Sequence, residues 1–151
     1  MIVIDASALA KFILKEGGWR DLAEHLKAGT VSADHAIKEV ANAVWKRFKR
    51  GAISLRESEL MLNALERLVG NSVIIEDESA HMGEAIRIAF SRDITIYDAI
   101  YIAIAKHKDL ALLTADERQA EAAKGEGVMV IRIDQKPSGS GGARGEGPAA
   151  P

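Results

Sequence analysis

Short apolar runs alternate with longer segments of helical periodicity along most of the chain. Runs at 2–4, 30–33, 72–75, 110–113 and 128–133 suit strands that are buried on both faces of a parallel sheet. Between them, apolar residues recur every three or four positions, which predicts helices over 6–14, 19–28, 34–50, 54–68, 77–92, 95–108 and 114–124. The alternation predicts an α/β domain with three α/β/α layers, a central parallel sheet of about five strands and right-handed crossovers.

The spacing of apolar residues also predicts which face of each helix is buried. The expected stripes are Ile37, Val40, Ala41, Val44, Trp45 and Phe48; Leu60, Met61, Ala64, Leu65 and Leu68; and Met82, Ala85, Ile86, Ala89 and Phe90. Three helix starts match the capping-box pattern: Ser54-x-x-Glu57, Thr95-x-x-Asp98 and Thr114-x-x-Glu117.

The composition changes sharply near the end of the chain. Residues 135–151 hold all three prolines and five of the thirteen glycines, a composition that cannot bury a core. We therefore expect one folded domain over 1–134, followed by a flexible Gly/Pro/Ser-rich tail over 135–151.

Bulk composition narrows the class of protein. At 48% hydrophobic and 28% charged residues, the chain is typical of a soluble globular domain, and no apolar run approaches the roughly 20 residues that span a bilayer. The start shows no signal-peptide pattern, so a cytoplasmic location is expected. The absence of cysteine excludes disulfides and thiolate metal sites. A formal net charge of −2 does not indicate a nucleic-acid-binding surface, but an acidic metal site can mask a local basic patch.

Asp98 is the one charged residue in the stretch Ile94–Ala105, where apolar side chains surround it on every helical face. A charge removed from water is costly unless it is paired, hydrogen-bonded or bound to a metal. Asp98 therefore either completes a capping box with Thr95 or faces a functional site. This stretch alone leaves both explanations open.

Three further carboxylates are expected near Asp98. Asp5 follows the first strand directly and Asp116 lies just past the fourth, and ligands of parallel α/β sheets bind outside the carboxyl ends of the strands. Asp98 begins the helix that leads into the fourth strand, and Glu39 lies one turn into the helix after the second. Taken singly, each acid has a simpler explanation as a helix cap, a first-turn acid or a solvated residue.

Taken together, four carboxylates in one cleft would repel one another, and a cation would remove that conflict. An all-oxygen ligand set suits Mg²⁺ or Mn²⁺ rather than zinc. The pattern therefore predicts a divalent metal site.

Four short motifs make the chain resemble the PIN-domain nucleases, most closely the VapC-type toxins of toxin–antitoxin pairs. The motifs are Asp5-Ala6-Ser7, Glu39-Val40-Ala41-Asn42-Ala43, Tyr97-Asp98-Ala99-Ile100-Tyr101 and Leu113-Thr114-Ala115-Asp116. Each is weak alone, but four in this order are fairly specific, and the resemblance covers residues 1 to about 133.

The resemblance implies a PIN-like fold and a Mg²⁺-dependent ribonuclease, with Mn²⁺ as a second suitable ion. Asp5, Asp98 and Asp116 would be the main metal ligands, Glu39 would complete the catalytic carboxylates, and Ser7, Asn42 and Thr114 would be supporting polar groups. Capping or turn hydrogen bonds are the alternative role for these last three. The expected products carry a 5′-phosphate and a 3′-hydroxyl. The resemblance further implies an RNA substrate, a small VapB-like antitoxin protein as partner, a homodimer and no membrane association.

Two other features do not alter this interpretation. The cationic run Lys46-Arg47-x-Lys49-Arg50 ends a long helix, where favourable interaction with the helix dipole explains it, and contact with RNA is the alternative. All four histidines are expected at the surface.

The alternatives to a toxin are a PIN nuclease with a housekeeping role in RNA processing and a non-catalytic partner-binding module. A receiver-like or phosphatase-like domain is disfavoured by the lack of a second acid near Asp5.

Overall fold

The computed structural model describes residues 1–133, so the predicted tail over 135–151 lies outside the described residues. Within this range, one parallel sheet has the strand order β3-β2-β1-β4-β5. The strands are β1 (Ile2–Ile4), β2 (Thr30–Ala33), β3 (Val73–Glu76), β4 (Leu112–Thr114) and β5 (Val130–Arg132). The predicted five-stranded parallel sheet is confirmed.

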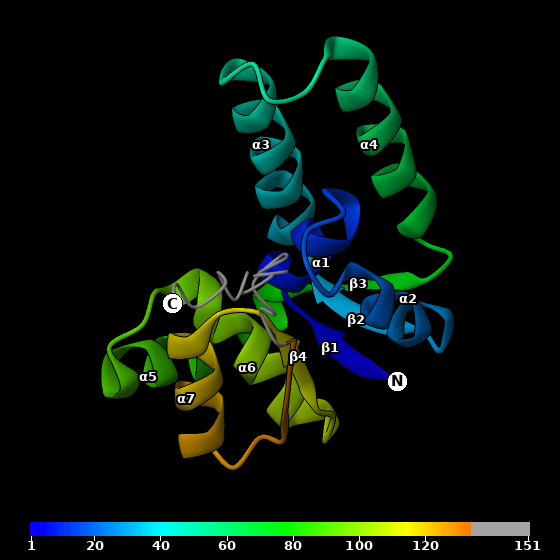
Figure 1. Cartoon of the computed structure of the whole chain (residues 1–151). Coiled ribbons are helices and arrows are strands. Elements are labelled where there is room, and N and C mark those ends of the chain that lie inside the picture. Colours follow the sequence, from blue (N-terminus) through cyan, green and yellow to red (C-terminus); the bar gives the residue numbers. More distant parts are fainter. Residues whose placement is uncertain (134–151) are drawn as a thin grey trace, which may run out of the picture.

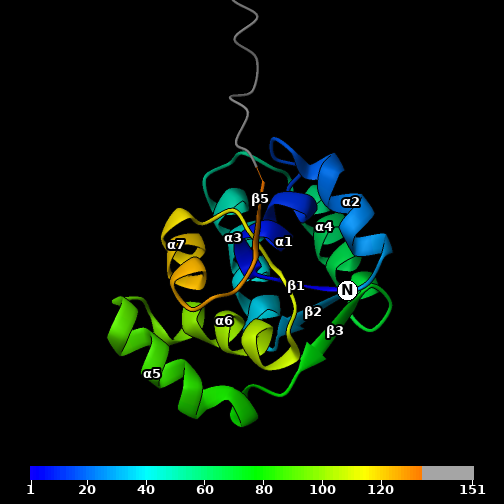
Figure 2. The same ribbon diagram turned by 90° about the horizontal axis from the view of Figure 1, so that it is seen from below.

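Helices cover both faces of this sheet. They are α1 (Ala6–Ile13), α2 (Trp19–Lys27), α3 (His35–Lys49), α4 (Leu55–Leu68), α5 (Met82–Arg92), α6 (Ile96–Lys108) and α7 (Glu117–Gly125), with a 3₁₀ turn, η1 (Glu78–His81), before α5. In Figures 1 and 2, α1, α3 and α4 lie on one side of the strands, and α5, α6 and α7 lie on the other. The predicted three-layer α/β/α architecture is confirmed, and no helix in residues 1–133 is long and apolar enough to cross a membrane.

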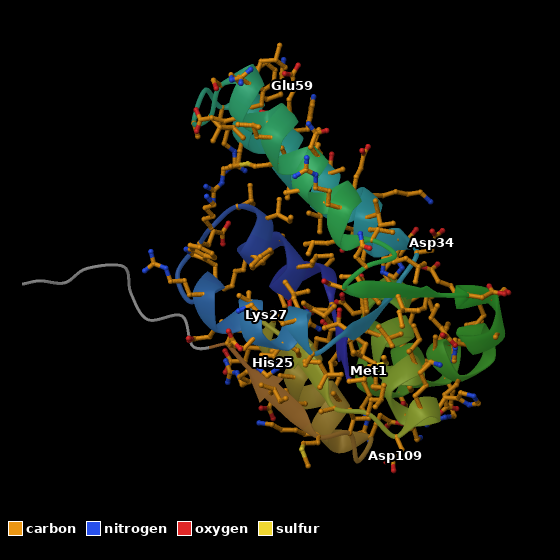
Figure 3. All side chains as sticks on the ribbon, turned by 90° about the vertical axis from the view of Figure 1, so that its right-hand side faces the viewer. Met1, His25, Lys27, Asp34, Glu59 and Asp109 are labelled. Atoms are coloured by element: carbon orange, nitrogen blue, oxygen red, sulfur yellow. The ribbon has the colours of Figure 1, made fainter. Side chains whose placement is uncertain are left out.

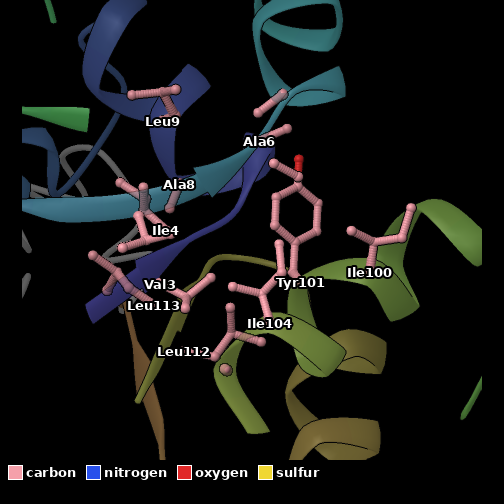
Figure 4. Packing of buried hydrophobic residues seen from close by; sticks show 14 of the residues in the cluster. Val3, Ile4, Ala6, Ala8, Leu9, Ile100, Tyr101, Ile104, Leu112 and Leu113 are labelled. Carbon is pink, nitrogen blue, oxygen red and sulfur yellow. The ribbon is translucent and has the colours of Figure 1, made fainter. Parts of the chain in front are cut away.

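Helix α6 is the central helix of the second layer. It packs against β1, β2 and β4, and every residue from Ala99 to Ala105 is buried. Figure 4 shows Ile104 of α6 beside Val3 of β1 and Leu112 of β4, and Tyr101 of α6 extending toward Ala6. This position explains why the stretch is apolar all round: the sheet covers one side of α6, and α5 and α7 pack against it.

Helices α3 and α4 form a hairpin that projects beyond the sheet. Figure 3 shows Asp34 at the base of this hairpin and Glu59 near its far end. Part of the predicted core stripe is exposed on this hairpin: Trp45 is 55% exposed and Leu60 58%. Phe48 and Ala64 are exposed as well, whereas Val40, Val44 and Leu65 are buried as predicted.

The predicted buried face of α5 is also partly wrong. The helix packs against α6 through Ala85, Ile88 and Ala89, so its buried stripe is rotated from the predicted one. Ile86 faces outward as a consequence, and Phe90 is 84% exposed.

The helix starts agree with the prediction at one of the three predicted capping boxes, that of Ser54 and Glu57. Thr95 caps α6 by accepting a hydrogen bond from the Asp98 amide, but within residues 1–133 the Asp98 carboxylate forms no return bond to the Thr95 amide, so this box is only half formed. Thr114, however, is the last residue of β4 and not the cap of α7. Asp116 takes that place and accepts from the Gln119 amide at 2.8 Å, because the strand continues one residue further than its apolar run.

Two of the histidines contradict the predicted surface location. His35 is 7% exposed and His81 is 5% exposed. Each is buried beside a glutamate that accepts from it: His35 Nδ1 lies 2.6 Å from Glu78 Oε1, and His81 Nε2 lies 3.1 Å from Glu76 Oε1.

Candidate metal centre

The carboxyl ends of β1 and β4 lie side by side at the centre of the sheet. The chain leaves β1 into α1 on one face and leaves β4 into α7 on the other, as Figure 1 shows. This divergence is a topological switch point, the place where parallel α/β proteins bind ligands. The candidate residues Asp5, Ser7, Thr114 and Asp116 all come from these two crossings.

Asp5 ends β1 and is only 2% exposed. Its carboxylate caps α1 by accepting from the Ala8 amide at 2.9 Å. The Ser7 hydroxyl donates to the same carboxylate at 2.8 Å, and Thr114 donates to its second oxygen from the end of β4. The capping role and a role in a site are therefore compatible, because a capped carboxylate is also held in one orientation.

Ser7 and Thr114 also tie the two crossings together through backbone groups. Ser7 accepts from the Ala115 amide at 3.0 Å, and Thr114 accepts from the Asp116 amide at 3.0 Å. The two predicted supporting hydroxyls therefore fix both Asp5 and the start of the turn that carries Asp116.

Burial raises the pKa of Asp5 from 3.8 to about 6. The hydrogen bonds from Thr114, Ala8 and Ser7 favour the charged form, but they do not outweigh the loss of solvation, and the negative charge of Asp98 raises the pKa further. A buried carboxylate near neutrality in pKa is a frequent property of functional sites.

Asp98 interacts with the other three acids. Burial is the largest cause of its raised pKa, and the charge of Asp116 adds to it. Burial likewise raises the pKa of Glu39, and Asp98 contributes there too. The structure therefore brings Asp5, Glu39 and Asp116 close enough to Asp98 for their charges to interact with it, although the four acids come from distant parts of the sequence.

The four carboxylates do not form a closed cage. Within residues 1–133, no three Asp, Glu or His side chains are grouped tightly enough to hold a metal ion on their own. The Glu39 side chain is 47% exposed, and Asp116 is exposed at the start of α7. Asn42 is exposed on α3 and forms no side-chain hydrogen bond with the part of the chain that the structure describes, so it stands apart from the network of Ser7 and Thr114.

A cavity of about 500 Å³ opens beside two of the acids. Its lining residues are Asp93, Ile94, Thr95, Asp98, Asp116 and Arg118. The cavity therefore lies between the first turn of α6 and the first turn of α7, and polar groups dominate its wall.

Gln119 is a residue of this region that the sequence analysis missed. Its side chain is buried and donates from Nε2 to the Asp98 carbonyl at 3.0 Å, while Oε1 lies 3.2 Å from Thr114 Oγ1. Gln119 thus links the start of α6 to the end of β4. The spacing Asp116-x-x-Gln119 fits a capping box and could have drawn attention to it.

His35 and Tyr101 were missed as well. The His35 ring lies between Tyr97 and Tyr101, with centroid distances of 5.3 Å and 4.9 Å. His35 Nε2 is 3.7 Å from Glu39 Oε1, too long for a hydrogen bond. Among the described residues, this nitrogen and the Tyr101 hydroxyl are buried without any hydrogen-bond partner.

The Tyr101 hydroxyl lies on the side of α6 that faces the acids. Burial is the largest cause of its strongly raised pKa, followed by the charges of Glu39 and Asp5. Figure 4 shows the hydroxyl pointing toward Ala6, the residue after Asp5. The Ala6 backbone lies close enough to the hydroxyl to act against this rise in pKa. Buried polar atoms are rarely left unpaired, so His35 Nε2 is the exception in this region.

Comparison with known proteins agrees with this geometry. Residues 2–125 match the PIN domain family. The chain is 31% identical to the ribonuclease VapC3 of Pyrobaculum aerophilum over 124 residues, which cover 80% of this chain and 92% of that protein. It is 28% identical to the exonuclease VapC9 of the same organism, with 82% and 86% covered. The ribonuclease VapC1 of Mycobacterium tuberculosis is 29% identical, with 80% and 89% covered.

Solved structures share the fold. PAE2754 of Pyrobaculum aerophilum superposes with a TM-score of 0.67 at 25% identity and covers 87% of this chain and 88% of its own. FitAcB of Neisseria gonorrhoeae superposes with a TM-score of 0.58 at 18% identity, with 87% and 96% covered. With the family match spanning nearly all of the described domain, the chain belongs to the PIN domain family.

Proposed function

We propose that this protein is a divalent-metal-dependent endoribonuclease that hydrolyses phosphodiester bonds of RNA. The observation that carries the proposal is the position of Asp98, whose charge acts on Asp5 and Glu39 and which is itself acted on by Asp116. Membership of the PIN domain family and the ribonuclease relatives support it.

The donor set fits Mg²⁺ or Mn²⁺. All four acids offer hard oxygen ligands, and Mg²⁺ is usually held by one or two carboxylates while it keeps several waters. An open arrangement without a closed cage is therefore suited to this ion. Asp5, Asp98 and Asp116 would hold it directly or through water, with Glu39 completing the shell. When bound, such an ion lowers the pKa of water and stabilises charge on the leaving oxygen.

The protein's own polar groups orient these carboxylates. Ser7 and Thr114 hold the Asp5 carboxylate in one rotamer, and Gln119 anchors the backbone of Asp98. His35 Nε2 is buried and lies 3.7 Å from Glu39 Oε1, so His35 is proposed to help position Glu39. Asn42, one turn after Glu39 on α3, is proposed to contact the RNA. The expected products are a 5′-phosphate and a 3′-hydroxyl.

Cleavage of RNA tests this function directly. We expect Mg²⁺ or Mn²⁺ to support cleavage, a chelator to abolish it, and Asp98→Asn to lower kcat at least about 100-fold, since several kcal/mol of transition-state stabilisation would be lost. Equal activity in the wild type and Asp98→Asn would remove the catalytic assignment.

A circular RNA tests the endonucleolytic part of the proposal. One relative is an exonuclease, and an exonuclease needs a free end. Linearisation of the circle with Mn²⁺ supports an endoribonuclease. If only linear RNA is degraded, the proposed metal site would stand, but the enzyme would be an exonuclease and not an endonuclease.

The biological role that we propose is that of the toxin in a toxin–antitoxin pair, as a cytoplasmic homodimer bound by a small VapB-like antitoxin. The VapC relatives support the role, and exposed apolar residues on α3 and α4, including Trp45 and Leu60, offer area for protein partners. Expression of the wild type should arrest growth, whereas Asp98→Asn should not. Normal growth with active enzyme would favour housekeeping RNA processing, and absence of metal-dependent stabilisation would favour a non-catalytic module.

A further inference from the structure

The cavity between α6 and α7 contains a positive charge that the metal site does not use. Arg118 lines it together with the proposed ligands Asp98 and Asp116. Arg118 is the second residue of α7, so its position is tied by the helix to that of Asp116. Its charge is close enough to lower the pKa of Asp98, against the larger effect of burial.

The Arg118 guanidinium forms one hydrogen bond with the described part of the protein and is otherwise exposed. Its Nη2 donates to the Asp93 carbonyl at 2.7 Å, and the Asp93 carboxylate lies 3.8 Å away. Asp93, the residue directly after α5, adopts the left-handed conformation and lines the cavity. A guanidinium has five N–H donors, and within residues 1–133 this is the one hydrogen bond that Arg118 forms. The side chain is 75% exposed, so its remaining donors are accessible.

The cavity is lined by three carboxylates, those of Asp93, Asp98 and Asp116, and by one guanidinium, that of Arg118. The acids would repel an RNA backbone, whereas an arginine beside them attracts one phosphate at a fixed offset from the metal ligands. The cavity volume of about 500 Å³ lies within the range of pockets that hold small organic ligands.

We propose that Arg118 and this cavity form a subsite for one backbone phosphate of the RNA, adjacent to the phosphate that is cleaved. This proposal rests on the ribonuclease function proposed above. The anchoring by Asp93 holds the guanidinium in place before RNA binds, so Arg118 contributes to substrate binding and register and not to the chemical step.

The test compares Arg118→Gln with the wild type on a set of short fluorescent RNAs. Each RNA carries a neutral methylphosphonate at one linkage, and binding is measured by anisotropy in Ca²⁺, with cleavage in Mn²⁺ followed on gels. In the wild type, one linkage beside the cleaved one should weaken binding about 10-fold when neutralised, as expected for one charge-assisted phosphate contact. Arg118→Gln should bind the unmodified RNA about 10-fold more weakly and should be insensitive to that linkage.

Two controls separate this subsite from general electrostatics. Arg67→Gln removes an exposed arginine from α4, outside the cavity, and should leave the pattern of sensitive linkages unchanged. Arg118→Lys keeps the charge without the planar fork and should retain part of the affinity. The slope of log affinity against log salt should fall by about 0.7 in Arg118→Gln, the value of one contact to a single strand.

The outcomes distinguish the two proposals. Equal binding by Arg118→Gln and the wild type, or loss of affinity at every linkage alike, would overturn the subsite. A linkage-specific loss of binding without metal-dependent cleavage would support the subsite and overturn the nuclease function. A raised KM with unchanged kcat in Arg118→Gln is the expected kinetic result.

Discussion

The Thr114 hydroxyl, at the end of β4, donates a hydrogen bond to the carboxylate of Asp5, at the end of β1, across 109 residues of sequence. The same hydroxyl accepts from the Asp116 amide. One buried side chain therefore connects two of the proposed metal ligands. Its geometry depends on the pairing of β1 with β4, in which Ile4 lies opposite Leu113.

Replacement of Thr114 by valine tests this connection. Thr114→Val keeps the shape but leaves the Asp116 amide without this acceptor and removes one of the three groups that donate to the Asp5 carboxylate. We therefore expect a loss of about 1–3 kcal/mol in the free energy of unfolding. The pKa of Asp5 should rise further, because the Thr114 hydrogen bond lowers it. Urea unfolding measures the first effect. Thr114→Ser keeps the hydroxyl and is the control; a similar loss in both variants would point to packing instead.

The pKa of Asp5 predicts how stability depends on pH. Because folding raises this pKa from 3.8 to about 6, the folded state binds the proton more tightly than the unfolded state. The contribution of Asp5 is full below pH 3.8 and is lost as the pH rises to about 6. The shift corresponds to about 3 kcal/mol at most. Thermal unfolding in metal-free buffer should show this fall, and Asp5→Asn should reduce it.

Other groups modify the profile in known directions. The raised pKa values of Asp98 and Glu39 act with the same sign as Asp5. Hydrogen bonds to cationic side chains lower the pKa values of Glu84 and Glu126 to about 2. Their contribution to stability is full above about pH 4.5 and is lost as the pH falls toward 2.

Since metal ligands bind deprotonated, Mn²⁺ should raise Tm more at pH 7.5 than at pH 5. An equal shift at both values would count against Asp5 as a ligand.

His35 offers a matched pair of substitutions. Asparagine can replace the Nδ1 donor that reaches Glu78, whereas glutamine can extend a polar group toward Glu39. If His35 orients Glu39, His35→Gln should retain more activity than His35→Asn, and Mn²⁺ affinity should follow the same order. If the bond to Glu78 alone matters, the order of stability and of activity will be the reverse. Calorimetric Mn²⁺ titration and urea unfolding together separate these cases.

Glu126 provides a substitution outside the proposed site. Its side chain is 4% exposed and bonds to Arg92 Nε at 2.7 Å, to Lys106 at 3.3 Å and to Arg87. Glu126→Gln should lower the free energy of unfolding by about 1–3 kcal/mol, because it weakens three charged hydrogen bonds that join α5 and α6 to the turn after α7. Lys106 lies eight residues from Asp98 along α6, about 12 Å away. RNA cleavage at a permissive temperature should therefore be unchanged, and a loss of kcat would show that the network reaches the site.

The strands were predictable because buried parallel strands are short apolar runs. Ile2–Ile4 and Thr30–Ala33 were predicted to the residue, and the others within a few residues. The convergence of Asp5 and Asp116 followed from the rule that ligands bind at the carboxyl ends of parallel strands. The proximity of Asp98 followed from its place at the start of the helix before β4.

The remaining features depend on tertiary contacts that periodicity does not encode. Ala85 and Ala89 are buried against α6 as predicted, but Ile88 completes the contact in place of Ile86 and Phe90. His35 is buried because Glu78, 43 residues away, accepts from both its ring and its backbone amide. Nothing in the sequence around Arg118 distinguishes it from other arginines. Its position beside Asp98 becomes apparent only in the folded chain, where both residues line one cavity.

Anomalous diffraction from crystals soaked in Mn²⁺ tests the central claim most directly, because it locates the ion without reference to activity. The account predicts a manganese peak among Asp5, Asp98 and Asp116, within direct or one-water distance of Asp98, and its loss in Asp98→Asn. A crystal that shows no peak at a Mn²⁺ concentration that supports RNA cleavage, or a peak bound elsewhere, would contradict it.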